Sequence, residues 1–548
     1  MQFAGNNAVN KIMTEISGHM VKALKATINP VDSANYDQKQ QLLTRLSENK
    51  LPLTKTLISY IEVLLFICAF PPDKKILAMA EQEMLRITAF LKNSKKSNTA
   101  LFTNSGLPFT PYVSRFSYDC VQWLMNHPGC KIRINQFEDG SFELNDVLKM
   151  TLPALERSET TAGLDNTTLL KTLSVKKQNQ LRFLIKEIGK LDKQPGITDH
   201  FFDGLGIQIE IIPKNRYFSR VYNRLVNPEV FFHREILRKF DYVRLFNTKI
   251  TAPVNLTSKQ KKKTILVVKN AMALKDRETD PVTYMDENSF RLYELERGIT
   301  VAFYGMLPQR QMPLESYVGY TLFKNGFPAV YGGGWVFGRR SHFGINIFET
   351  FRGGESGYMM CQLLRVFRQV FKIEYFEIEP YQFGLDNAEG IESGAFWFYY
   401  RYGFRPLDKK LLKIANGEFV KIAKPKHYRS PEKILVKFTE SNMALNLGKK
   451  IPVGVYDISN KVIRMIRVQY HGDREKAEAG CVIKFTEKTG LNASLSEHEA
   501  QVLKEVAMWA EALKINERKK LDLFVQMVKI KPADLYRYQQ LLLQFFNE

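Results

Sequence analysis

A glycine-rich turn between an apolar stretch and an amphipathic stretch is the part of this sequence best suited to bind a ligand. The turn reads RGGESG, from Arg352 to Gly357. Gly353 and Gly354 let the backbone approach a ligand closely and adopt angles that residues with a Cβ atom avoid. A helix beginning after them presents unpaired N–H groups and the positive end of its dipole, which favours an anion such as phosphate. Arg352 can add a bidentate contact. A tight strand-to-helix connection without a ligand is the alternative.

The stretches on either side of the turn are expected to hold it on a sheet. Residues 345–348 predict a strand that ends at the turn, and a helix is expected after it. A second strand at 375–378, an aromatic helix stopped by Gly403 and a short strand at 404–407 complete the segment. The helix after the turn carries apolar residues at the i, i+3, i+4, i+7 spacing of a face packed on a sheet. These residues are Met360, Leu363, Leu364, Phe367 and Phe371.

Two segments of this region resemble motifs of the GNAT superfamily of N-acyltransferases. FRGGESG resembles the loop that binds the pyrophosphate of acyl-CoA, with Arg352, Gly353 and Gly357 on matching positions and Glu355 where the family usually has its middle glycine. GAFWFYYRYGF resembles the last motif of the family, with Glu392 in place of the asparagine that usually opens it. The residues that match this last motif are Ala395, Phe398, Tyr399, Gly403 and Phe404.

The resemblance implies an acyl-CoA-dependent N-acyltransferase. Its co-substrate would be acetyl-CoA or another acyl-CoA, and its acceptor an amine that the sequence does not identify. The family fold splays two neighbouring strands apart, so that the pantetheine arm can bond to the open backbone edge. The residues implied to hold the cofactor are Phe348, Arg352, Gly353, Gly354, Glu355, Ser356, Gly357 and Tyr358.

Such a transfer is a direct attack of an amine on a thioester. The enzyme must deprotonate the ammonium, polarise the thioester carbonyl and protonate the leaving thiolate. Tyr399 matches the family tyrosine that can act as general acid, with an aromatic core residue as the alternative. Glu349, at the end of the first strand, is the first candidate for the general base, and Glu377 and Glu379 on the next strand are further candidates. His342 is better explained as a residue at a strand end.

Several other chemistries have no support in the sequence. It contains no HExxH, GxSxG or Walker-type loop and no paired Cys/His cluster, so no metal site or serine nucleophile is expected. The five cysteines are scattered without a CxxC pair, which favours a reducing cytoplasm over a disulfide framework. The apolar run 57–70 is shorter than the about 20 residues that span a bilayer and contains Glu62, so a buried helix and no transmembrane segment are expected.

The net charge of +22 favours an anionic partner, such as nucleic acid, an acidic surface or CoA itself. Residues 216–246 interleave arginines with aromatic residues, a pattern that can bind single-stranded nucleic acid. The same pattern fits a pair of amphipathic helices, which is the interpretation we favour. The basic run SKQKKK at 258–263 is expected to be a linker or an exposed turn. A basic nucleic-acid-binding protein and a catalytically inactive GNAT-like scaffold therefore remain alternatives to the transferase.

The chain of 548 residues is expected to have a mixed α/β (α+β) fold with more than one domain. Four regions are expected. They are a mostly helical domain at 1–200, a mixed connecting region at 201–262, a GNAT-like acyltransferase domain with a mixed sheet at 263–410, and a basic, largely helical region at 411–548.

Three local patterns in the third region give specific expectations. Asn325-Gly326 between two alternating stretches predicts a β-hairpin. The apolar run 264–268 predicts a strand, and residues 286–297 predict a helix.

Overall fold

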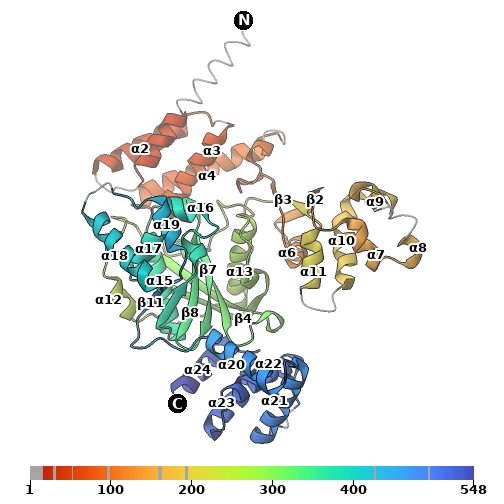
Figure 1. Ribbon diagram of the computed structural model, residues 1–548. Helices are drawn as coiled ribbons and strands as arrows, with labels where there is room; N and C mark the ends of the chain where they lie inside the picture. Colours follow the sequence, from red (N-terminus) through yellow and green to blue (C-terminus); the bar gives the residue numbers. More distant parts are fainter. Residues whose placement is uncertain are drawn as a thin grey trace. The chain divides into compact units, whose positions relative to one another are not determined.

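The computed structural model describes residues 17–28, 33–51, 53–95, 99–157, 163–173, 175–191, 196–424, 428–491 and 494–547 (Figure 1). The expected mixed α/β class is confirmed, since 54% of residues lie in helices and 15% in strands. The chain forms two compact units. Unit 1 contains residues 1–236, 257–283 and 324–328, and unit 2 contains 237–256, 284–323 and 329–548. The region 201–262 is therefore divided between the two units.

Among the described residues, unit 1 begins with a helical stretch at 17–26, which is followed by helices α2, α3 and α4. In α3 (Lys55–Ala69) ten of the fifteen residues are buried, which confirms the buried helix expected there. It contacts α4 (Lys74–Asn93). Asp73 caps the start of α4, because its carboxylate accepts a hydrogen bond from the Ile76 amide at 2.9 Å. The helix α2 (Ser33–Glu48) also contacts α4.

A small α/β subdomain makes up most of the rest of unit 1. Its antiparallel sheet has β3 (Ile207–Pro213) between β1 (Tyr112–Ser114) and β2 (Cys130–Phe137). One apolar core joins the sheet to the helices around it, and fully buried residues such as Val121, Leu184 and Ile209 lie in it. The helices are α6 (Tyr118–Met125), α7 (Leu144–Thr151), α8 (Ala154–Arg157), α9 (Asn166–Thr172), α10 (Gln180–Ile188), α11 (Ile197–Gly204), α13 (Ser258–Ala273) and α14 (Asp280–Thr283).

Helix α13 corrects two expectations. The run 264–268 is not a strand, and SKQKKK is not a linker, because both belong to this helix. A capping box between Thr257 and Gln260 starts the helix, and the lysines occupy its solvent-facing first turns. Ile265 and Val268 are then buried on one face, so tertiary packing outweighs the strand preference of β-branched residues.

The segment 216–241 also departs from expectation, because the structure has turns, bends and irregular backbone there and not a pair of helices. Two of its arginines form ion pairs within unit 1. Arg220 forms an ion pair with Glu62 and Arg224 one with Glu81. The interleaved pattern therefore reflects local packing, which periodicity alone does not distinguish from a helix pair.

Unit 2 is built on an eight-stranded sheet with the order β10-β11-β9-β8-β7-β6-β5-β4. The pair β8/β9 is parallel, and the pairs β4/β5, β7/β8, β9/β11 and β10/β11 are antiparallel. The strands are β4 (Met285–Leu295), β5 (Ile299–Met306), β6 (Ser316–Lys324), β7 (Phe327–Phe337), β8 (Arg340–Ile347), β9 (Tyr375–Ile378), β10 (Arg405–Pro406) and β11 (Met443–Asn446).

Two hairpins of this sheet test the predictions from the sequence, and they confirm one prediction and show that another is wrong. Asn325 and Gly326 both have positive φ between β6 and β7, which confirms the expected hairpin. Residues 286–297 are not a helix, because β4 fills most of this range and pairs with β5 through a turn at Arg297-Gly298. Both turn residues have positive φ, and the pairing of β4 overrides the helical preference of its charged residues.

Helix α15 (Ser356–Phe371) packs on the sheet as its spacing predicted. The ring of Phe367 lies 5.2 to 6.5 Å from Phe303 of β5, Tyr320 of β6, Phe343 of β8 and Phe376 of β9. The remaining helices near the sheet are α12 (Tyr242–Asn247), α16 (Ala388–Ser393), α17 (Ala395–Arg401), α18 (Lys409–Ala423) and α19 (Glu432–Phe438).

A C-terminal helical bundle completes unit 2. Trp509 is fully buried in its core and contacts Phe337 at the end of β7. Tyr538 donates a hydrogen bond to the Leu314 carbonyl at 2.6 Å, so the bundle is joined to the sheet by polar as well as apolar contacts. The helices are α20 (Val455–Gln469), α21 (Arg474–Thr489), α22 (Glu497–Ala512), α23 (Arg518–Ile530) and α24 (Leu535–Asn547).

Replacing Phe367 by alanine is expected to lower the free energy of unfolding by about 3–5 kcal/mol, because a large buried side chain leaves a cavity at the centre of the sheet. Urea denaturation followed by tryptophan fluorescence measures the change. Val420→Ala on α18, where the side chain is about half exposed, should change it by no more than about 0.5 kcal/mol. Equal effects of the two substitutions would contradict this view of the core.

Candidate functional site

The parallel strands β8 and β9 separate beside the glycine-rich turn. Their register covers three residue pairs and ends at His342 and Glu377, although β8 continues to Ile347. β9 ends at Ile378, and the chain turns into the short 3-10 helix Pro380–Phe383. The edge of β8 that faces β9 is therefore not continued by strand pairing beyond His342.

The side chain of Gln382 fills this opening. Its Oε1 atom accepts hydrogen bonds from the Ile345 amide and from the Tyr399 hydroxyl, both at 3.1 Å. A Cβ atom on Gly344 would lie 3.3 Å from Gln382 Nε2, so glycine at this position leaves room for the amide. The alternation of a strand places the polar groups of Ile345 and Ile347 on the same edge, and the Ile347 carbonyl accepts a hydrogen bond from Arg352 Nε at 3.0 Å. Side chains, which can rotate away, thus satisfy both groups.

Backbone amides at the start of α15 are available to a ligand. The amides of Arg352 and Gly354 donate within the turn, at 3.2 and 3.3 Å. Those of Gly353, Ser356, Gly357 and Tyr358 have no acceptor in the described stretch 196–424 or elsewhere in the described chain. Gly353 has a φ of 84°, and a Cβ there would have no atom within 4 Å, so the space beside it is open. The amides of the first helical turn carry the positive end of the dipole.

Both charged side chains of the turn are paired. Arg352 forms an exposed ion pair with Glu389 of α16. The Glu355 carboxylate is fully buried, forms an ion pair with Arg297 and accepts the Leu237 amide at 3.1 Å. Glu355 therefore does not place an uncompensated negative charge beside the open amides.

Packing alone explains one of the glycines. A Cβ atom on Gly357 would lie 1.8 Å from the Tyr402 hydroxyl oxygen, so only glycine fits beneath that ring. Phe348 and Tyr358 are likewise buried, with Phe348 stacked on Tyr331 at 5.0 Å between centroids. These positions support the turn whether or not a ligand binds.

Tyr399 lies on α17 with its ring in an aromatic core. Its side chain is 3% exposed and packs against Phe398 and Phe404. Burial raises the pKa of Tyr399 above its ordinary value, so the hydroxyl keeps its proton at neutral pH. The hydrogen bond to Gln382 connects this proton to the open edge of β8.

The three candidate carboxylates differ in their surroundings. Glu349 lies directly after β8, in the short 3-10 helix Glu349–Phe351, and is exposed. Glu379 is also exposed, after β9. Glu377 is buried, forms an ion pair with Arg340 and accepts a hydrogen bond from Asn442 at 2.6 Å. His342 Nε2 lies 4.0 Å from Glu377. Of the three, Glu377 is held in a network, whereas Glu349 and Glu379 face solvent.

Residues that the sequence motifs did not indicate complete the site. Gln382, Glu389 and Arg297 each contact a predicted site residue, although Arg297 lies 58 residues before Glu355 in the chain. Their positions depend on how the hairpin and helices pack. The Arg297-Gly298 turn was the only local signal that could have drawn attention to one of them.

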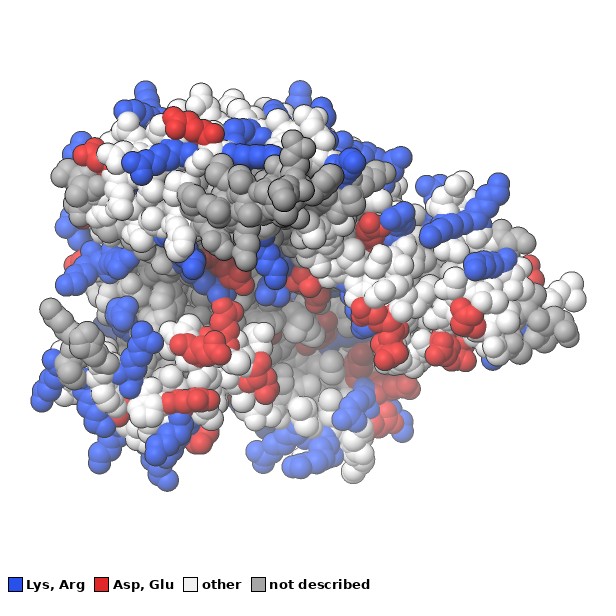
Figure 2. Space-filling model, turned by 90° about the horizontal axis from the view of Figure 1, so that it is seen from above, with Lys and Arg blue, Asp and Glu red and all other residues white. Residues whose placement is uncertain are grey.

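Positive charge is not gathered into one patch on the face shown in Figure 2. Lys and Arg side chains are spread over the face shown in Figure 2, with Asp and Glu side chains among them. Within the described parts of the chain, no three or more His, Cys, Asp or Glu side chains come together as metal ligands would. No helix of the described residues has the length and apolar character needed to cross a membrane.

Comparison of the chain with protein-family models, with curated proteins and with solved structures finds no match.

Arg297→Gln is expected to lower the free energy of unfolding by about 3–5 kcal/mol, because it leaves the buried Glu355 carboxylate without its cation. Arg352→Gln is the matched control, since it breaks an exposed ion pair and should cost no more than about 1 kcal/mol. Chemical denaturation of the two variants measures the difference. A loss for Arg297→Gln no larger than that for Arg352→Gln would show that the buried pair does not hold the turn.

Proposed function

We propose that the protein is an acyl-CoA-dependent N-acyltransferase of the GNAT type, with its site between β8 and β9. One observation carries the proposal, namely that the Ile345 amide on the open strand edge and the Tyr399 hydroxyl share one acceptor, Gln382 Oε1. A backbone donor that can bond to a pantetheine arm and a proton donor for a thiolate are thereby adjacent. The turn with unpaired amides follows on the same strand.

The cofactor would bind in two parts. Its diphosphate would lie on the free amides of Gly353 and of Ser356 to Tyr358, where the helix dipole favours an anion. Arg352 would exchange Glu389 for a phosphate oxygen, gaining a bidentate contact. The pantetheine arm would take over the Ile345 amide once the Gln382 side chain turns away.

The residues then supply the proton transfers of aminolysis. The amine nitrogen attacks the thioester carbon, the C–N bond forms, and the C–S bond breaks with its electron pair on sulfur. Before the attack, Glu349 takes one proton from the acceptor ammonium, directly or through water, and passes it to solvent. As the C–S bond breaks, Tyr399 gives its proton to the sulfur, and the second proton that the nitrogen loses on becoming an amide restores the Tyr399 hydroxyl. A backbone N–H of the open edge polarises the carbonyl oxygen. Burial raises the pKa of Tyr399, so the hydroxyl carries its proton when the thiolate begins to form.

A GNAT-like protein that binds acyl-CoA or a partner without turnover is the second candidate. Two contacts favour this second candidate. Arg352 is paired with Glu389, and Gln382 accepts a hydrogen bond from the Ile345 amide on the open edge, and both contacts must break before a cofactor can bind. Binding and turnover measurements separate the two functions.

Calorimetric titration should detect binding of acetyl-CoA or of a long-chain acyl-CoA. Arg352→Ala is expected to weaken it about tenfold through the lost phosphate contact, and Glu389→Ala to strengthen it, since it frees Arg352. Arg401→Ala, at an exposed arginine of α17, is the control and should leave affinity unchanged. Absence of binding with both thioesters would remove the transferase and the acyl-CoA-binding scaffold together.

Tyr399→Phe is expected to lower kcat about 100-fold and to leave acyl-CoA affinity nearly unchanged, because only the proton donor is lost. Release of free CoA thiol in the presence of a panel of amines measures turnover. Tyr400→Phe on the same helix is the matched control, since the Tyr400 hydroxyl is also buried but bonds to Asn416. Acyl-CoA binding without acylation of any amine would favour the inactive scaffold.

A further inference from the structure

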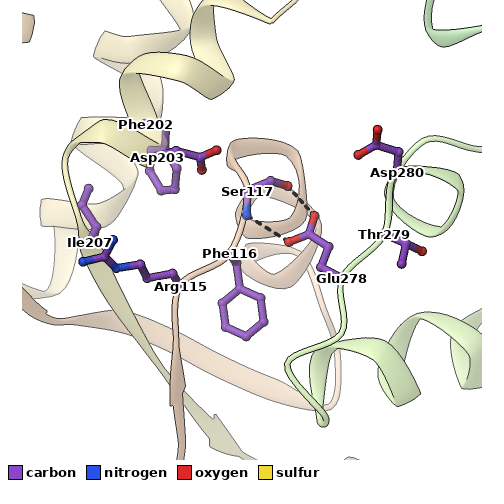
Figure 3. A pocket seen from close by; sticks show the side chains of 9 residues that line it. All are labelled: Arg115, Phe116, Ser117, Phe202, Asp203, Ile207, Glu278, Thr279 and Asp280. Carbon is purple, nitrogen blue, oxygen red and sulfur yellow. Dashed lines mark hydrogen bonds between the residues drawn. The ribbon is translucent and has the colours of Figure 1, made fainter. Parts of the chain in front are cut away.

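A pocket of about 330 Å³ lies within unit 1, and all nine of its lining residues belong to that unit (Figure 3). We propose that this pocket binds a small organic cation, an ammonium or guanidinium group on a short apolar body. The proposal does not depend on the transferase function, because every residue that carries it lies outside unit 2.

The charge of the pocket is negative. Three of its side chains are carboxylates, those of Asp203, Glu278 and Asp280, and one is a guanidinium, that of Arg115. They come from separate segments, namely the end of α11, the loop after α13 and the start of α14. In Figure 3 the Arg115 side chain extends toward Ile207, on the side away from Glu278. Arg115 is moreover paired with Glu138, which does not line the pocket, at 3.0 Å, so the pocket keeps an excess of negative charge.

The carboxylates differ in the number of hydrogen bonds that they accept. Glu278 accepts hydrogen bonds from the Ser117 amide at 3.0 Å, from the Ser117 hydroxyl and from the Thr283 hydroxyl at 2.6 Å, so it caps α6. The Asp203 carboxylate accepts no hydrogen bond from any residue that the structure describes. Asp203 keeps part of its surface exposed to solvent; partial desolvation by the surrounding protein and the nearby Asp199 and Glu278 carboxylates raise its pKa, while His200 and Arg115 act in the opposite direction. A bound cation would relieve both effects, and Asp203 is its natural partner.

The remaining walls favour an organic cation over a metal ion. Phe116, Phe202 and Ile207 are each less than 5% exposed and line the pocket with apolar surface. Among the described residues, no three or more His, Cys, Asp or Glu side chains lie close enough together to hold a metal ion, and this includes the side chains of the pocket. Its volume is at the lower end of small-molecule sites, which suits a ligand the size of benzylamine or agmatine. The C-terminal end of α11, at Gly204, adds a negative potential that also favours a cation.

Calorimetric titration of the full chain with benzylamine, agmatine and the neutral benzyl alcohol tests the proposal. Benzylamine should bind at least about tenfold more tightly than benzyl alcohol, since the two differ mainly in charge. Asp203→Asn should weaken benzylamine binding about tenfold. Asp146→Asn is the control, because it removes one exposed carboxylate of α7 that does not line the pocket.

Three results would overturn the proposal. The first is equal affinity for benzylamine and benzyl alcohol in the unsubstituted protein, a comparison that needs no variant. The second is benzylamine binding that neither Asp203→Asn nor Asp280→Asn weakens, with circular dichroism showing both variants folded. The third is the absence of benzylamine binding, and Mn²⁺ binding that Asp203→Asn abolishes would then assign a metal to the pocket.

Discussion

The structure of unit 2 depends on how the backbone edge of β8 is satisfied once β9 leaves it. A buried amide or carbonyl without a partner costs about 1–3 kcal/mol, so the separation of two strands needs replacement partners. Gln382 supplies one for Ile345 and Arg352 supplies one for Ile347. The absence of a side chain at Gly344 makes room for the first of these contacts. An interior edge satisfied by side chains, rather than by a strand, can be opened without unfolding the sheet, which is what the proposed function requires.

The charges around the turn are likewise satisfied by partners, in this case through ion pairs. Glu355 puts a carboxylate next to amides that would otherwise favour an anion. Arg297 removes that conflict, because the ion pair buries the charge in a neutralised form between the β4–β5 hairpin and α15. The hairpin thus supports the turn from a distant part of the sequence. The exposed Arg352–Glu389 pair is different in kind, since solvent screens it and its partners can separate at low cost.

Local signals predicted the elements that carry the site, and failed where tertiary packing decides. The hairpin at Asn325-Gly326, the helix α15 and the strand before it follow from turn chemistry and periodicity, which act within a few residues. The run 264–268 and the segment 286–297 were predicted wrongly, because a capping box and the pairing with β5 outweigh propensity there. Among the candidate site residues, the turn was indicated by its glycines, and Tyr399 only by the resemblance to the last GNAT motif. Gln382, Glu389 and Arg297 could not be found from the sequence, because their roles exist only through contacts between distant segments.

The burial of Tyr399 links its structural role to its proposed chemistry. A hydroxyl in an apolar core needs an acceptor, and Gln382 Oε1 provides it as long as the amide remains in the opening. A ligand that displaces Gln382 from Ile345 would also remove the acceptor of Tyr399. The cost of that unpaired hydroxyl is offset only if the ligand offers an acceptor at the same place, and the sulfur of a thioester, or the thiolate formed from it, can do so. A ligand that enters the opening would therefore displace Gln382 and, in the same step, make the Tyr399 hydroxyl available as the proton donor.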